Sequence, residues 1–140
     1  YNKLFQIIKK INAKKLNKID IYQNKKNNFV KKILNKSDLF ILPSLEEGLS
    51  IALAEAMSMK TLCFVSRPSN HSKIIINNKN GYEFNLNKKS FLRGFNKIQK
   101  LKSKNIEKVT SKARESIKQL VIKNITFETK IINKLLSNHQ

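Results

Sequence analysis

The chain has 140 residues, with 29 lysines and arginines against nine acidic residues, a formal net charge of +20 and 40% hydrophobic residues. This length fits one domain of ordinary size, and no apolar run approaches the ~18 residues that a membrane-spanning helix needs. A lone cysteine, Cys63, cannot form an internal disulfide, and two histidines are too few for a zinc cluster. The chain opens with Tyr1 and shows no secretory signal, so we expect a single domain over residues 1–140 that is a fragment lacking its start.

The positive charge comes mostly from lysine, since only Arg67, Arg93 and Arg114 are arginines. The 26 lysines, 18 asparagines and 18 isoleucines are residues that A/T-rich codons encode, so codon bias accounts for the excess without a ligand. The bidentate fork of arginine, which proteins use to read bases and phosphates, is scarce. Nucleic acid is therefore a disfavoured partner. The lysine-rich segment from Lys97 to Lys123 is expected to be a solvated face, and its charge allows a peripheral membrane contact with anionic lipid.

Segments with helical spacing alternate with short apolar runs, which is typical of a parallel sheet flanked by helices. The spacing predicts an amphipathic helix over Leu4 to Leu16 and a brief strand over Ile19 to Tyr22. It also predicts a helix over Asn27 to Asn35, with an apolar buried side formed by Phe29, Val30, Ile33 and Leu34. The continuously apolar run from Leu39 to Leu42 is expected to be a strand covered on both faces.

The next apolar run, Leu62 to Val65, follows a predicted helix over Leu49 to Met59. A strand, a helix and a strand in this space predict a right-handed crossover with parallel strands. We further expect a short helix at His71 to Ile76 and a strand at Tyr82 to Phe84.

The remainder of the chain is expected to form three helices, interrupted at Ser103 to Asn105 and at Asn124 to Thr126. The predicted fold class is therefore α/β, a Rossmann-like parallel sheet flanked by helices with a helical C-terminal tail.

The helix predicted from Leu49 to Met59 is apolar on every side, so we expect it to be largely buried. Glu55 is the only charge inside it, and a carboxylate there is costly unless a partner satisfies it. A hydrogen bond to nearby backbone or a bidentate bond to ligand hydroxyls would each do so. The residues alone do not decide between these two roles of Glu55.

The loop Pro43 to Gly48 lies where ligands bind an open parallel sheet, after the carboxyl end of a strand. It leads into a helix whose first N–H groups have no partner inside the helix and therefore attract anions, above all phosphate. Gly48 lets a ligand approach the backbone closely. Glu47, eight residues before Glu55, lies in this loop or at the helix start, so both carboxylates can border one cleft.

The segment Ser37 to Ser50, continuing to Glu55-Ala56-Met57, resembles the donor-binding signature of retaining glycosyltransferases of group 1, also called family 4, which have the GT-B fold. The signature has an aspartate before an apolar strand, then Pro-Ser, Glu-Gly, and a second glutamate before Ala-Met. Asn80-Gly81-Tyr82 resembles a later turn of the family. The resemblance implies the C-terminal, nucleotide-sugar-binding half of a GT-B enzyme.

The resemblance also implies the roles of individual residues. Glu47 would be the catalytic residue and, with the backbone N–H groups of Gly48, Leu49 and Ser50, would hold the sugar hydroxyls and the diphosphate. Glu55 would bind the ribose hydroxyls. Ser44 would complete the donor site, although a serine there is more often a turn residue or cap.

Arg67 and His71 both follow the second apolar run and could contact the donor at the rim of its site. The resemblance implies a UDP- or GDP-sugar as substrate, no cofactor and no metal, a glycan or lipid-linked acceptor, and a role in polysaccharide biosynthesis. We expect a cytoplasmic protein, at most peripheral at the inner membrane face.

The chain departs from the family pattern in three places. Lys60 and Leu62 stand where the family has glycine and proline, and Lys73 stands where relatives often have glutamate. The family's upstream arginine and lysine, which neutralise the departing diphosphate, and its acceptor domain would precede Tyr1, so we expect this chain alone to be inactive.

Other functions also remain open. Glu46 or Glu47 could simply stabilise the positive end of the helix. The chain as a whole could be a non-catalytic anion- or nucleic-acid-binding module, or a GT-B-like sugar-nucleotide epimerase.

Overall fold

The computed structural model describes residues 20, 22–46, 50–70 and 73–137. The chain divides into two compact units, Tyr1–Val30 and Lys31–Gln140, and each is described by itself. In the first unit the helix predicted from Leu4 to Leu16 lies outside the described residues. Of the strand predicted at Ile19 to Tyr22, only Asp20 and Tyr22 are described, and neither is in a strand. The Tyr22 ring packs edge-on against Phe29, with ring centroids 4.9 Å apart.

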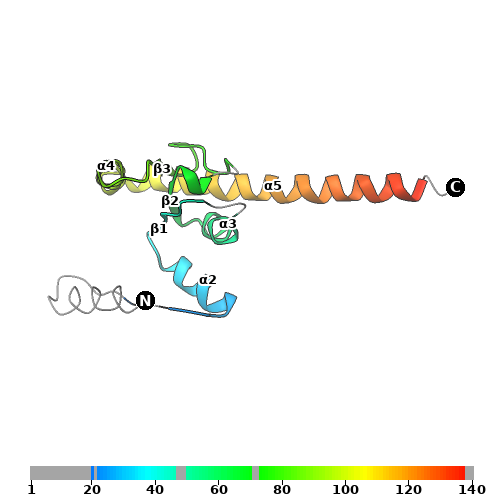
Figure 1. The fold of residues 1–140 in the computed structure, drawn as a ribbon, viewed down its shortest axis with the longest axis horizontal. Coiled ribbons are helices and arrows are strands. Elements are labelled where there is room, and N and C mark those ends of the chain that lie inside the picture. Colours follow the sequence, from blue (N-terminus) through cyan, green and yellow to red (C-terminus); the bar gives the residue numbers. More distant parts are fainter. Residues whose placement is uncertain (1–19, 21, 47–49, 71–72, 138–140) are drawn as a thin grey trace. The chain divides into compact units, whose positions relative to one another are not determined.

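Helix α2 (Asn27–Asn35) has the predicted bounds (Figure 1). Leu34 is buried as predicted, whereas Ile33, expected on the same buried side, is 40% exposed. The carbonyl oxygen of Leu34 accepts a hydrogen bond of 3.0 Å from the hydroxyl of Thr61, the residue that precedes the central strand. This bond ties the end of α2 to the sheet.

The sheet has three parallel strands in the order β1 (Leu39–Leu42), β2 (Leu62–Ser66) and β3 (Tyr82–Phe84). All three lie where the apolar runs predicted them. Every residue of β2 is buried because this strand has a neighbour on each side. The prediction that β1 is covered on both faces is wrong for the described sheet: β1 is at its edge and Ile41 is 37% exposed.

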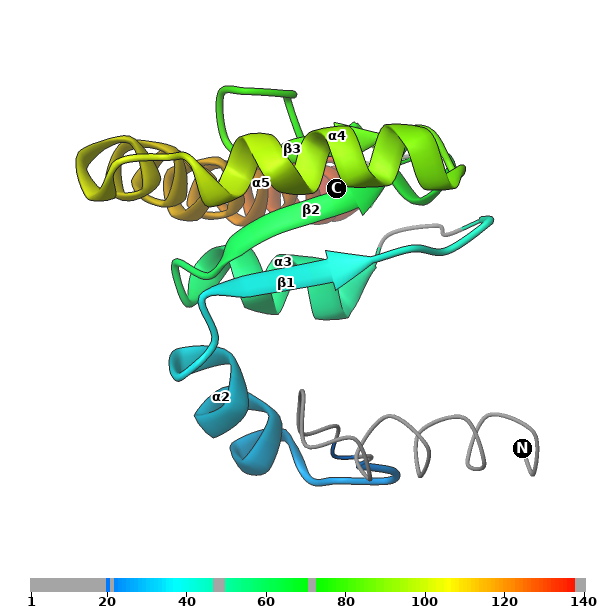
Figure 2. The same ribbon diagram turned by 90° about the vertical axis from the view of Figure 1, so that its left-hand side faces the viewer.

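The helices cover both faces of the sheet. Figure 2 shows α4 (Lys88–Gln99) in front of the strands, with α3 (Ile51–Ser58) and α5 (Ser103–Ser137) behind them. On the α4 side the ring centroid of Phe84 lies 4.5 Å from that of Phe64 and 5.2 Å from that of Phe91. Aromatic pairs of this kind stabilise a fold by about 0.5–1.5 kcal/mol beyond the area they bury. The α/β class, with helices flanking a parallel sheet and a helical tail, is confirmed.

Helix α3 is apolar on every side and was predicted to be largely buried, but its burial is uneven. Leu53, Ala56 and Met57 are at most 1% exposed, whereas Ile51 is 72% exposed. Only one face of α3 meets the sheet and α5, and the opposite face is left to solvent. The helix ends as expected, since Lys60 adopts the left-handed conformation (φ 59°) that glycine takes most easily after a helix.

Two predictions for the second half of the chain are also wrong. The expected helix at His71 to Ile76 does not form over the described residues 73–76, and a short 3₁₀ turn at Pro68–Asn70 precedes them. The interruption expected at Asn124 to Thr126 is absent because α5 continues to Ser137. The Thr126 hydroxyl donates to the Ile122 carbonyl oxygen at 2.9 Å, so a polar residue is satisfied within the helix.

Across the part of the chain that the structure describes, α5 included, no helix combines the length and the apolar character needed to cross a membrane.

Candidate functional site at the carboxyl edge of the sheet

The loops that follow β1 and β2 are held together by serine hydroxyls. The Ser66 hydroxyl donates to the backbone carbonyl oxygen of Ser44 at 2.5 Å. The Ser69 hydroxyl lies 3.0 Å from that of Ser66 and within bonding distance of the carbonyl oxygens of Ser66 (2.8 Å) and Leu42 (3.2 Å). Ser66 and Ser69 are 0% and 1% exposed. These bonds position the start of the predicted donor loop against the end of the central strand.

Sequence reasoning did not identify Ser66 and Ser69. The signal was present, because small polar residues stood directly after a continuously apolar run. Which carbonyl groups they would bond could be read only once β1 and β2 were known to be neighbours. Ser44 was predicted as a donor-binding residue, and the structure shows its backbone bonded within this serine cluster.

Ser50 caps helix α3, which begins at the next residue. Its hydroxyl accepts a hydrogen bond of 3.3 Å from the backbone N–H of Leu53, and its backbone is extended (φ −73°, ψ 107°). A serine in this position satisfies one of the free N–H groups of the first turn and stabilises a helix by about 1 kcal/mol. The predicted contact of the Ser50 backbone N–H with a diphosphate stays a prediction. Glu47, Gly48 and Leu49 lie outside the described residues.

Glu55 lies on α3 and is partly buried. It lines a hollow of about 550 Å³, together with residues from α2, α3 and α5: Lys31, Ile51, Ala54, Ser58, Met59, Arg114 and Lys118. Three of these are cations, so an anionic ligand that enters the hollow would meet positive charge there. Within the described part of the chain its oxygens receive no hydrogen bond, which leaves them available to hydroxyl donors of a ligand.

Arg67 directly follows β2, at the same edge of the sheet as Ser44. The register pairs Leu42 with Val65, so the chain leaves both strands at the same level. The backbone N–H of Arg67 donates to the Phe84 carbonyl oxygen at 2.9 Å, and the residue is exposed. The structure therefore places Arg67 at the carboxyl edge of the sheet, and its contact with the donor stays a prediction. His71, the other predicted rim contact, lies outside the described residues.

No three His, Cys, Asp or Glu side chains gather into a metal-binding group among the residues that the structure describes. That the site needs neither metal nor cofactor stays a prediction.

The turn Asn80-Gly81-Tyr82 leads into β3. Asn80 is 2% exposed, and its side chain accepts from the Ile76 N–H (2.6 Å) and donates to the Ile74 carbonyl oxygen (3.0 Å). A Cβ atom on Gly81 would lie 2.7 Å from the end of the Ile75 side chain and 3.2 Å from the Cys63 carbonyl oxygen, so a larger residue requires Ile75 to shift. The turn is thus structural, and it sets the entry into β3.

Comparisons with known proteins agree with this architecture. Residues 2–117 match the family model described as "Glycosyl transferases group 1". Over 60 residues the chain is 38% identical to the Escherichia coli UDP-Gal:alpha-D-GlcNAc-diphosphoundecaprenol alpha-1,3-galactosyltransferase. The aligned segment covers 43% of this chain and 16% of that protein.

Solved structures show the same fold. A glycosyltransferase from Rickettsia africae superposes with a TM-score of 0.73 at 21% identity, covering 94% of this chain and 36% of that one. The C-terminal domain of a glycosyl transferase group 1 family protein from Francisella tularensis gives 0.68 at 18% identity, over 84% of this chain and 60% of that one. The sucrose-phosphate synthase from Thermosynechococcus elongatus gives a TM-score of 0.79 at 12% identity, covering 99% of this chain and 35% of that one.

The chain therefore spans only part of each of these proteins, and at such low identity the structural likeness establishes the fold alone. The family assignment rests on the family model, which covers well over half of the chain. The predicted resemblance is confirmed: this chain belongs to the glycosyl transferases of group 1.

Proposed function

We propose that this chain is the nucleotide-sugar-binding portion of a retaining glycosyltransferase that transfers a hexose from a UDP- or GDP-sugar to a glycan or lipid-linked acceptor. The observation that carries the proposal is the position of Glu55. Its carboxylate lines a large hollow on α3, and α3 begins directly after the loop at the carboxyl edge of the sheet. Ligands bind open α/β sheets at this edge.

In this proposal the Glu55 carboxylate accepts hydrogen bonds from the two ribose hydroxyls. Carboxylates form strong, charge-assisted bonds with hydroxyl donors, and a bidentate geometry selects a vicinal diol. Arg114 and Lys118 line the same hollow and would attract the negatively charged nucleotide. This role needs a Glu55 that is open to ligand, which agrees with its place in the lining of the hollow.

Glu47, with the backbone N–H groups of Gly48, Leu49 and Ser50, would hold the sugar and the diphosphate. The free N–H groups at a helix start favour an anionic group, and a diphosphate gains negative charge as the sugar departs. Binding the donor in one orientation would supply the remainder of the rate enhancement. The chain alone is expected to bind the donor without catalysing transfer.

The name of the Escherichia coli relative specifies UDP-Gal as donor and a sugar linked to diphosphoundecaprenol as acceptor. We extend this to the present chain as its preferred substrate class, a UDP-hexose and a lipid-linked sugar. Its place would be the cytoplasmic side of a membrane, where such an acceptor is presented.

The proposal is tested by titrating the chain with UDP, UDP-galactose and GDP and following both thermal unfolding and heat of binding. A nucleotide that binds the folded state raises the melting temperature. Glu55→Gln should weaken binding of the preferred nucleotide about tenfold, because a charged acceptor of two hydroxyls is lost. Glu107→Gln, an equal change at an exposed position of α5, should leave the affinity as in the unmodified chain.

Two results would contradict the proposal. One is the same nucleotide affinity in Glu55→Gln and in the unmodified chain. The other is an absent response to every nucleotide together with tight, salt-sensitive binding of DNA, which would favour the non-catalytic binding module instead.

A further inference from the structure

A second hollow lies at the opposite edge of the sheet from the donor site. It has a volume of about 360 Å³ and is formed by the turn before β3, the first residue of β3, the end of α4 and the first turns of α5. Its lining consists of Asn78, Lys79, Tyr82, Lys97, Leu101, Asn105, Lys108, Val109 and Lys112. Because Tyr82 begins a strand whereas Ser44 and Arg67 follow strand ends, parallel pairing places the two sites at different edges.

This hollow is strongly basic. Four of its nine lining residues are lysines, and among the described residues that line it no side chain is acidic. Lys108 and Lys112 are four residues apart on α5, where like charges repel and destabilise a helix by a few tenths of a kcal/mol. A bound anion would turn this repulsion into attraction.

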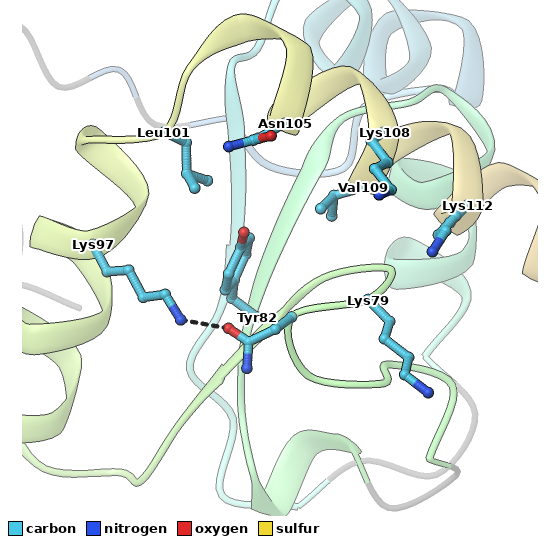
Figure 3. A pocket seen from close by; sticks show the side chains of 9 residues that line it. Lys79, Tyr82, Lys97, Leu101, Asn105, Lys108, Val109 and Lys112 are labelled. Carbon is cyan, nitrogen blue, oxygen red and sulfur yellow. Dashed lines mark hydrogen bonds between the residues drawn. The ribbon is translucent and has the colours of Figure 1, made fainter.

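One lysine is already oriented into the hollow. The ammonium group of Lys97 donates to the side-chain oxygen of Asn78 at 2.6 Å and lies 5.7 Å from the centre of the Tyr82 ring. Figure 3 shows Lys97 reaching in from α4 while Lys108 and Lys112 descend from α5, with the Tyr82 ring between them in this view. A ligand would meet a partly ordered set of donors, which lowers the entropy lost on binding.

The floor of the hollow is apolar. Tyr82 and Val109 are each 7% exposed, and both belong to the hydrophobic core cluster. The Tyr82 hydroxyl is a neutral hydrogen-bond donor at physiological pH, and burial raises its pKa further. The hollow therefore combines cationic walls with an aromatic surface, which suits an anion that carries an organic group.

We propose that this hollow binds a phosphate monoester, with its phosphate among Lys97, Lys108 and Lys112 and its organic group against Tyr82. A monoester carries a charge of about −1.5 to −2 near pH 7 and three acceptor oxygens, which matches several ammonium donors. The volume is near the lower end of the ~300–1,000 Å³ typical of small-ligand pockets. The ligand is either a free phosphorylated metabolite or the headgroup of a lipid.

The probe for the free ligand is phenyl phosphate, titrated by calorimetry, with phenol and inorganic phosphate as partial ligands. Phenyl phosphate should bind more tightly than either part. The double variant Lys108→Gln with Lys112→Gln should weaken its binding at least tenfold. Lys104→Gln with Lys123→Gln changes the net charge equally on exposed parts of α5 outside the hollow and should retain the affinity.

The probe for the lipid source is co-flotation with phosphatidylcholine vesicles that do or do not contain one-fifth phosphatidic acid. Binding of phenyl phosphate without flotation on phosphatidic acid assigns the hollow to a soluble ligand. Flotation only with phosphatidic acid, lost in the hollow variant and kept in the control, assigns it to a lipid headgroup. Two results would overturn the proposal. One is equal weakening of probe binding in both double variants, because surface charge would then explain the attraction. The other is that neither probe binds.

Circular dichroism and urea unfolding of both double variants identify any loss of fold. A third substitution, Tyr82→Leu, keeps the cations and removes the aromatic surface. It should weaken the binding of phenyl phosphate while leaving the binding of inorganic phosphate unchanged. A damaged fold would not produce this difference between the two ligands.

Discussion

The side-chain amide of Asn80 donates a hydrogen bond of 3.0 Å to the hydroxyl of Ser116, and this bond joins the turn before β3 to the middle of α5. Ser116 in turn donates to the Lys112 carbonyl oxygen at 2.8 Å. Asn80 also bonds the backbone of Ile74 and Ile76. One buried amide thus satisfies two backbone groups of an irregular segment and connects that segment to a helix far along the chain.

Asn80→Ala should therefore be among the most destabilising single substitutions in the described part of the chain. It removes three hydrogen bonds worth about 1 kcal/mol each and leaves buried backbone groups without a partner, so we expect a loss of about 3 kcal/mol. Ser116→Ala removes one bond and should cost about 1 kcal/mol. Urea unfolding of the two single variants and the double variant measures their coupling. Equal losses in both single variants would show that Asn80 does not organise the turn.

Gly94 lies on α4 directly over the ring of Phe64. A Cβ atom there would be 2.6 Å from the tip of that ring, which is itself 0% exposed and held against Phe84 and Phe91. Alanine favours a helix over glycine by about 1 kcal/mol, but overpacking a core costs about 1–3 kcal/mol. Gly94→Ala should therefore lower the free energy of unfolding by roughly 1 kcal/mol.

A second variant distinguishes crowding from other causes. In a Phe64→Leu background, where the ring is gone, Gly94→Ala should become neutral or stabilising. If Gly94→Ala stabilises the unmodified chain, then α4 does not approach the sheet as closely as the structure has it.

Cys63 lies in the centre of β2 and is 1% exposed, as expected of a small buried hydrophobic residue. Burial raises the pKa of its thiol from 9.0 to about 12. Because the thiolate is the reactive form, iodoacetamide should label Cys63 negligibly in the folded chain at pH 9 and rapidly in urea. Labelling at similar rates in both states would contradict the burial.

The same shift makes stability depend on pH. Between pH 9.0 and about 12 the unfolded thiol loses its proton while the folded one keeps it, so the unfolded state binds fewer protons and stability falls as pH rises. The stability difference between the unmodified chain and Cys63→Ala should therefore diminish over this range. Because the two proteins differ only at this residue, the comparison isolates the contribution of the thiol. A difference in the free energy of unfolding that stays constant over this range would show that the thiol pKa is not raised.

The extent to which sequence predicts this fold differs between elements. α2, β1 and β3 have their predicted bounds, because periodicity and a terminal proline or glycine are local signals. The break expected near Thr126 failed for an equally local reason. A threonine hydroxyl can bond to the carbonyl group four residues earlier, so polar residues alone do not end a helix.

Some features of the candidate site were likewise predictable from the sequence, and others were not. The spacing of Glu47 and Glu55 and the family resemblance came from the sequence, whereas the hollow that Glu55 lines with residues of α2 and α5 did not. A helix of apolar residues was expected to be largely buried. Which of its faces would be covered depended on the position of α5, which comes from far along the chain.

The sequence by itself determined the α/β class, the three parallel strands and the family, because hydrophobic periodicity and short motifs act over a few residues. The tertiary structure decided which side chains share a hollow. Lys97, Lys108 and Tyr82 stand on three elements, and only the packing of those elements brings them together. Burial, hydrogen-bond partners and local charge depend on distances in space, and spacing along the chain does not specify these.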